Sequence, residues 1–132
     1  MVEAGLGLLV EVARNGGEED SAHDVTVALL AQEHRPTAIF ASHDMLAISA
    51  LAAIAEHRLS VREVSVVGYD NTQLAAHPAI SLTSVDQSGL EMETHAVTML
   101  LERIGGRTEP RRLTISPTLR VRGSTGPPPP DA

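Results

Sequence analysis

The chain has 132 residues, 42 % of them apolar, with 17 acidic against 10 basic side chains and no cysteine. This length suits one domain with one core, by the usual allowance of roughly 100 to 200 residues per domain. A net charge of −7 repels a nucleic-acid backbone, and the lack of cysteine excludes disulfides, zinc–thiolate sites and thiol chemistry.

The first part of the chain predicts a strand, a helix and a second strand. "LGLLVEV" at 6–12 is a short apolar run closed by "RNGG", which is typical of a strand and a turn. Residues 20–34 open with acids and a serine and space their apolar side chains along one face, which predicts a helix. Pro36 ends that pattern, and "TAIFA" at 37–41 is a continuous apolar strand of the kind found in covered parallel sheets.

A long helix and another strand follow. "MLAISALAAIAEH" at 45–57 is rich in alanine and leucine and lacks a helix breaker, so it predicts a helix. "VSVVGY" at 64–69 is the next strand, and the strand, helix and strand fit one right-handed crossover in a parallel sheet. We therefore expect an α/β protein. The helix is apolar on almost every side, so it needs a second cover besides the sheet.

The last third predicts one more strand and one more helix. Alternating "SLTSVDQ" at 81–87 indicates a strand. Residues 88–104 place their apolar side chains on one stripe before Gly105 and Gly106, which suit a helix end.

Two short strands are predicted to close the domain, "RRLTIS" at 111–116 and "TLRVR" at 118–122. Beyond them, "STGPPPPDA" has nothing to bury. We therefore expect a domain of residues 1–123 and a flexible tail of residues 124–132.

Polar side chains follow two of the predicted strands. Ser42, His43 and Asp44 come after the first of these strands, and Asp70 and Asn71 come after the second. In parallel sheets the carboxyl ends of the strands share one edge, where ligands bind. A carboxylate beside imidazole and amide groups suits the hydroxyls or ring nitrogens of a small polar molecule.

Plainer interpretations stay open for these residues. Asp44 could cap the helix that begins at Met45. Asp70 and Asn71 could form a turn by bonding backbone amides, and His43 on its own could be a surface histidine.

Catalytic and metal-binding patterns are missing from the sequence. Ser42, His43 and Asp44 contain the letters of a hydrolase triad, but consecutive residues cannot align nucleophile, base and orienter. The six histidines show no spacing of three or four residues, which removes a helical metal pair. No G-x-G-x-x-G or Walker-type loop follows a strand. We expect neither an enzyme nor a cofactor.

Five stretches, in order, resemble the effector-binding region of LacI/GalR-type transcriptional regulators. They are "RPTAIFASHDMLAISAL", "VREVSVVGYDNTQLA", "SLTSVDQ", "AVTMLLERIGG" and "LRVRGST", and together they cover much of the chain. The resemblance implies two Rossmann-like lobes around a ligand cleft, related to periplasmic sugar-binding proteins, behind a helix-turn-helix headpiece. It implies for this chain a Rossmann-like three-layer parallel sheet, that is, a partial periplasmic-binding-protein-like type I domain.

The resemblance also implies a ligand site. Asp70 matches the family's ligand-binding aspartate, and His43 stands where an asparagine often touches effector. Gln87 falls where the chain crosses between lobes. The expected ligand is a small-molecule effector, with sugars the commoner family theme. Because glycines stand at 16 and 17 where the family often has an aromatic residue, and a clamping arginine would lie upstream, we expect weak or no binding by this chain alone.

The resemblance implies a homodimer paired through the second lobe. Ile48, Ala52 and the loop at 74–80 are the expected interface, and the open alternative is that helix 20–34 or 88–104 covers that side. In the family, helix 88–104 belongs to the first lobe. Its apolar stripe is therefore expected to dock in an unusual place, swap onto a partner or be poorly ordered.

The expected function is the sensing and dimerisation part of a bacterial repressor that reaches operator DNA only through a headpiece absent from this chain. The alternative is a solute-binding protein of a sugar transport system. No apolar run approaches the roughly 20 residues that cross a bilayer, and no signal-peptide pattern opens the sequence. We therefore expect a cytoplasmic protein without membrane contact.

Overall fold

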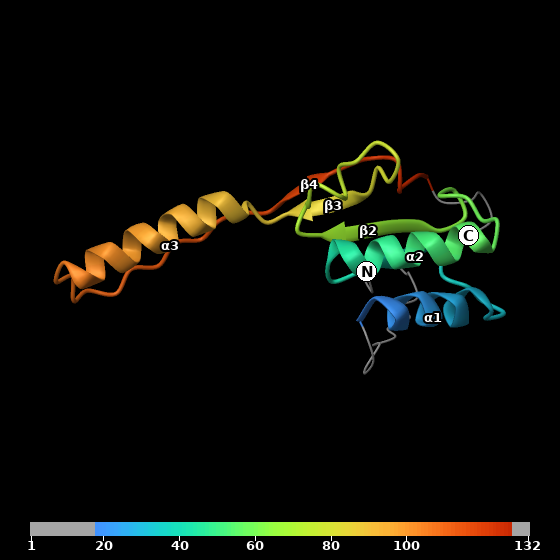
Figure 1. Cartoon of the computed structure of the whole chain (residues 1–132), viewed down its shortest axis with the longest axis horizontal. Helices are drawn as coiled ribbons and strands as arrows, with labels where there is room; N and C mark the ends of the chain where they lie inside the picture. Colours follow the sequence, from blue (N-terminus) through green and yellow to red (C-terminus); the bar gives the residue numbers. More distant parts are fainter. Residues whose placement is uncertain (1–17, 128–132) are drawn as a thin grey trace.

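The computed structural model describes residues 18–127 and contains one mixed sheet with three helices (Figure 1). Strands β1, β2 and β3 are parallel, and β4 runs antiparallel to β3 in the sheet order β1-β2-β3-β4. This confirms the predicted α/β fold with a mostly parallel sheet. The elements in chain order are α1 (Glu18–Leu30), β1 (Ala38–Phe40), α2 (Asp44–Glu56), β2 (Ser65–Tyr69), β3 (Thr83–Asp86), α3 (Gly89–Ile104) and β4 (Thr118–Arg120).

Two of the predicted strands have no counterpart among the described strands. The strand predicted at 6–12 lies outside the described residues. The strand predicted at 111–116 was wrong, because this segment joins no ladder and instead runs back along α3 (Figure 1). Its Arg111 Nη1 contacts Glu102 Oε1 of that helix at 2.7 Å. A helix uses its backbone hydrogen bonds internally, so it offers the segment side-chain partners but no strand edge.

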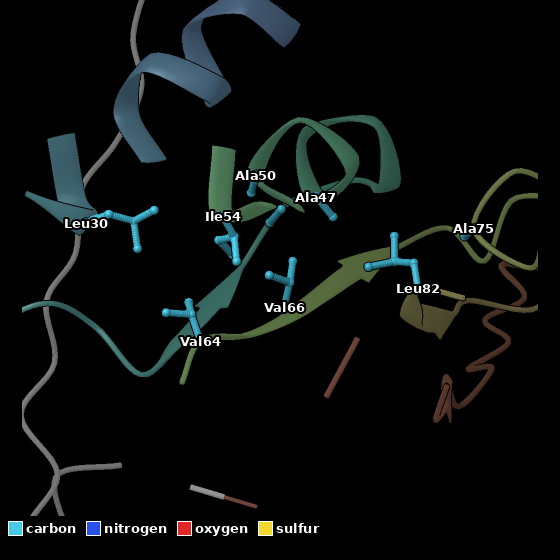
Figure 2. Close-up of a cluster of buried hydrophobic side chains, with 9 residues drawn as sticks. Leu30, Ala47, Ala50, Ile54, Val64, Val66, Ala75 and Leu82 are labelled. Carbon is cyan, nitrogen blue, oxygen red and sulfur yellow. The ribbon is translucent and has the colours of Figure 1, made fainter. Parts of the chain in front are cut away.

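The core lies between α2 and β2. Ala47, Ala50 and Ile54 recur at the helical spacing and pack with Val64 and Val66 in one buried cluster (Figure 2). Alanine at two of these helix positions lets the helix axis approach the sheet closely. The composition of the helix thus fixes where β2 and the loop after it lie.

The second side of α2 is covered by α1, which lies on the face away from the sheet (Figure 1). Leu30 of α1 belongs to the same core cluster. The helix predicted at 20–34 therefore covers the second side of α2, as one of the alternatives considered from the sequence had it. Ile48 is half-buried and Ala52 stays exposed, and the dimer interface expected at these residues remains a prediction.

An ionic contact links α1 to α2. His23 Nε2 lies 3.1 Å from Glu56 Oε2, and His23 Nδ1 lies 3.4 Å from Asp24 Oδ1. The hydrogen bond with Glu56 raises the pKa of His23 above its ordinary value of 6.5, and Asp24 adds to the effect. A histidine whose pKa is higher in the folded state than in the unfolded state stabilises the fold when it is protonated. This contribution is complete at pH values below the ordinary pKa, and it is lost as the pH rises through the raised pKa.

We predict that the unfolding temperature of the wild type falls between about pH 5.5 and about pH 8.5 by more than that of a His23→Gln variant. The difference should be small, because both carboxylates are mostly exposed. Thermal melts of the two proteins at both pH values, with His34→Gln at an exposed position as the control, measure it. Equal falls in wild type and His23→Gln would contradict the prediction.

Ser124 is inserted beside β2, although a flexible tail was expected from this residue onward. Only 2 % of Ser124 is exposed. Its backbone O accepts from Val66 N at 2.8 Å, its Oγ donates to Val66 O at 2.6 Å, and the same Oγ accepts from Thr83 N at 2.8 Å. The expectation was wrong at Ser124, because the β2–β3 pairing starts at Val67 and leaves Val66 needing partners there. Residues 128–132 lie outside the described residues.

Helix α3 forms where it was predicted and projects away from the sheet, with residues 107–117 returning beside it (Figure 1). We call residues 89–117 the arm and residues 107–117 the return segment. No residue of α3 is buried, and the helix packs on no other described helix or strand to a substantial extent. The apolar stripe of α3 is therefore left open.

Candidate functional site

Three predicted site residues follow the carboxyl ends of the parallel strands, an edge that we call the rim. His43 precedes α2 as its N-cap in extended conformation, Asp70 follows β2, and Gln87 follows β3. The structure brings two of them into contact, since Gln87 Nε2 donates to Asp70 Oδ1 at 2.8 Å. Asp70 is exposed, while Gln87 and His43 are half-buried.

Behind the rim, the Asp44 carboxylate is buried and fully engaged. Only 1 % of Asp44 is exposed. Its Oδ2 accepts from Thr72 N at 2.7 Å and Thr72 Oγ1 at 2.9 Å, and its Oδ1 accepts from Ser84 Oγ at 2.6 Å. The capping role considered from the sequence was wrong, because His43 is the N-cap and Asp44 turns toward the loop and β3.

Gly68 makes room for this carboxylate. A Cβ at this position would overlap Asp44 Oδ1 and would lie 3.0 Å from Leu82 Cδ2 and 3.3 Å from Ala47 Cβ. Any larger residue would collide with the Asp44 carboxylate and crowd the side chains of Leu82 and Ala47. Gly68, the residue before the last of β2, therefore allows the close approach of the Asp44 side chain at the start of α2.

The loop after β2 aims the Asp70 side chain outward. Asp70 and Asn71 have φ values of 99° and 50°, in the left-handed region that aspartate and asparagine tolerate better than most residues. Asp70 N donates to Val85 O at 3.0 Å, and Asn71 N donates to Ser84 Oγ at 3.0 Å. With Thr72 bonded to Asp44, three consecutive residues are held from behind, and the carboxylate of Asp70 faces solvent.

A second polar cluster joins the rim to the start of the arm. Asn71 Nδ2 donates to Asp86 Oδ2 at 3.1 Å, and Arg122 donates to Asn71 Oδ1. Arg120 Nη2 donates to the same Asp86 oxygen at 3.0 Å, and Ser88 N donates to Asp86 Oδ1 at 2.9 Å. The Ser88 amide, followed by the Arg120 guanidinium, lowers the pKa of Asp86.

Sequence reasoning missed Thr72, Ser84 and the Asp86 cluster. The available signal was the two-residue spacing of Arg120 and Arg122 on a closing strand, which places both arginines on one side of the strand. Asn71, considered both as an amide at the ligand edge and as a turn residue, bonds side chains of β3 and of the segment after β4.

The chemistry of the rim is that of polar recognition. An exposed carboxylate accepts hydrogen bonds from hydroxyl or N–H groups, and an amide both donates and accepts. Among residues 18–127, no group of three histidine or acidic side chains is placed to hold a metal ion. Within the same range, no helix is long and apolar enough to cross a membrane.

Comparison with known proteins gives this geometry a context. A family model described as a periplasmic binding protein-like domain matches residues 2–125. The HTH-type transcriptional repressor PurR of Pasteurella multocida is 35 % identical over 127 residues, which are 94 % of this chain and 38 % of the relative. This chain is part of a LacI-family effector-binding domain.

Solved structures of LacI-family regulators agree with this assignment. A LacI-family regulatory protein from Chloroflexus aggregans superposes with a TM-score of 0.79 at 30 % identity, covering 96 % of this chain and 47 % of that one. The regulator CelR in complex with cellobiose gives a TM-score of 0.72 at 34 % identity, covering 80 % of this chain and 33 % of that one. The chain thus spans less than half the length of these three relatives, whose names describe regulatory proteins.

Proposed function

We propose that this chain is the effector-sensing and dimerisation part of a bacterial transcriptional repressor, with the effector bound at the rim by His43, Asp70 and Gln87. The observation that carries the proposal is the exposed Asp70 carboxylate on a loop held rigidly from behind. A loop held in this way keeps the Asp70 carboxylate at the rim without a bound ligand. Pre-organisation of this kind lowers the entropic cost of binding.

A sugar-like effector fits the rim best. The carboxylate of Asp70 and the amide of Gln87 lie within 2.8 Å and offer adjacent acceptor and donor groups, which suit vicinal hydroxyls. A ligand hydroxyl that donates to Asp70 would share or replace the bond from Gln87. The related regulator CelR was solved as a complex with cellobiose, which supports a sugar as the first ligand to test.

Effector binding would act through the two segments that meet at the rim. Asp70 belongs to the loop after β2, whereas Gln87 lies where the chain leaves the sheet toward α3. A ligand that bridges the two favours one relative placement of these segments, and this differential affinity is what shifts a conformational equilibrium. A DNA-binding headpiece outside this sequence would convert the shift into operator binding or release.

The dimerisation part of the proposal places Ile48 and Ala52 of α2 at a two-fold interface, together with the loop at 74–80. Ala52 is exposed, and Leu74 of that loop is exposed although it is a large apolar residue. Apolar surface of this kind favours pairing with a second copy. A transport-type solute-binding protein shares the fold, but no described contact favours it over the regulator.

Calorimetric titration tests the effector site. A protein of the full length of the relatives that includes this sequence should bind one member of a sugar panel led by cellobiose, with purine bases tested in parallel. Asp70→Ala should weaken that binding by about 10- to 100-fold, since hydrogen bonds to a charged group are among the strong ones. The 132-residue chain alone should bind weakly or not at all.

The control is Glu33→Ala, which removes an exposed acid outside the rim. It should leave affinity unchanged. An affinity that is unchanged in a folded Asp70→Ala variant would refute the proposed site. Micromolar binding by the 132-residue chain alone would refute the expectation that this chain binds weakly or not at all.

A further inference from the structure

The side-chain amide of Asn71 lies between a group that only accepts and a group that only donates hydrogen bonds. Its Nδ2 donates to Asp86 Oδ2 at 3.1 Å, and its Oδ1 accepts from Arg122 Nη2. The Ser88 amide and the Arg120 guanidinium lower the pKa of Asp86, so this carboxylate stays ionised at neutral pH and has no proton to donate. The amide of Asn71 therefore fits in one orientation, because a flip would lose both bonds.

Both partners of Asn71 are themselves held in place. Arg122 Nη1 donates to Leu82 O at 2.6 Å, and Arg122 N donates to Thr83 Oγ1 at 2.8 Å. The side chain of Asp86, at the end of β3, is only 19 % exposed. The amide is thus fastened to β3 and the segments beside it, and not to another part of its own loop.

The backbone at Asp70 and Asn71 needs such an anchor. The φ angle is 99° at Asp70 and 50° at Asn71. Two consecutive residues other than glycine with positive φ cost conformational free energy, and such backbone persists where surrounding contacts over-determine it. The bonds from Asp70 N to Val85 O and from Asn71 N to Ser84 Oγ give part of this hold. The two side-chain bonds of Asn71 add to it.

We propose that Asn71 is a positioning residue of the effector site: its amide, bonded to Asp86 and Arg122, fixes the loop that carries the Asp70 carboxylate. The amide bonds protein groups at both ends, so its effect on a ligand passes through Asp70. Without this anchor the loop samples other conformations, and the ordering of the loop on binding then lowers affinity. The inference rests on the proposed function, because it takes Asp70 as a residue that touches the effector.

Calorimetry on the full-length protein tests the effect on affinity, with cellobiose or whichever sugar of the panel binds the wild type. Asn71→Asp keeps an acceptor for Arg122 but sets a second carboxylate against Asp86, so it should raise the Kd by about 10-fold. Gln73→Glu adds the same charge at an exposed position of the same loop and should change the Kd little.

A reciprocal exchange separates the pairing of Asn71 with Asp86 from a general loss of structure. Asp86→Asn alone replaces one accepting oxygen with a donor, so either Asn71 or Ser88 loses its bond, and the Kd should rise. The double variant Asn71→Asp/Asp86→Asn keeps the net charge and restores a donor opposite an acceptor. Its Kd should lie closer to that of the wild type than the Kd of either single variant. Thermal melts establish that all variants fold.

Amide hydrogen exchange measures the hold on the loop without ligand. The amides of Asp70 and Asn71 donate hydrogen bonds in the structure, so they should exchange faster in Asn71→Asp and more slowly again in the double variant. Equal exchange in the wild type and Asn71→Asp would overturn the positioning role. A double variant as impaired as the single variants would also overturn it.

Asp70→Ala, measured beside these variants, distinguishes failure of this inference from failure of the proposed function. If Asp70→Ala weakens binding and Asn71→Asp does not, the role of Asn71 is refuted and the effector site stands. If Asp70→Ala leaves affinity unchanged, or no sugar binds, the effector site is refuted. The exchange rates of the Asp70 and Asn71 amides then still decide whether the Asn71 side chain holds the loop.

Discussion

An Asp44→Ala variant is expected to lose about 3 kcal/mol or more of unfolding free energy. The substitution removes a carboxylate that is 1 % exposed and leaves Thr72 N, Thr72 Oγ1 and Ser84 Oγ without their acceptor. Asp44→Asn should cost less, because its amide oxygen still accepts and the Ser84 hydroxyl can rotate to accept from the amide. Urea denaturation of the wild type, Asp44→Ala and Asp44→Asn measures the three unfolding free energies and so ranks them.

The matched control for this prediction is Glu33→Ala, which removes an exposed acid and should change stability by about 0.5 kcal/mol or less. Amide hydrogen exchange adds a local readout, because Thr72 N should exchange faster in Asp44→Ala. A loss below about 1 kcal/mol would mean that the three bonds do not hold the Asp70 loop.

A Ser124→Ala variant is expected to lose about 2 to 3 kcal/mol. Removal of Oγ leaves the buried Thr83 N without an acceptor and takes one donor from Val66 O, while the backbone bond from Val66 N to Ser124 O can remain. Denaturant unfolding gives the value. Ser42→Ala, at an exposed serine, should be nearly neutral, and a similar loss in both variants would contradict a special role for Ser124.

Local composition was sufficient to predict the central elements. The alanine- and leucine-rich run at 45–57 and the apolar run at 64–69 became α2 and β2, because each has one strong propensity and no competing signal. The same reasoning placed Asp70 at the end of a buried strand. Its exposure and its bond to Gln87 are consistent with the predicted site, while the ligand itself remains a prediction.

The contacts behind the rim could not be read from local patterns. An aspartate at the start of a helix has the same local signature whether it caps the helix or turns toward another segment. For Asp44 the outcome depends on Thr72 and Ser84, which lie 28 and 40 residues further along the chain. Ser124 looked like the start of a tail because its partner Val66 is 58 residues away.

The Asp86 carboxylate ties the arm to the loop that carries Asp70. One of its oxygens accepts from Ser88 at the root of the arm, and the other accepts from Asn71, the neighbour of Asp70. The returning strand contributes Arg120 to the same oxygen. Rotation of the arm about its root would therefore strain the bond between Asn71 and Asp86, so this carboxylate couples the arm to the loop beside the direct bond from Gln87 to Asp70.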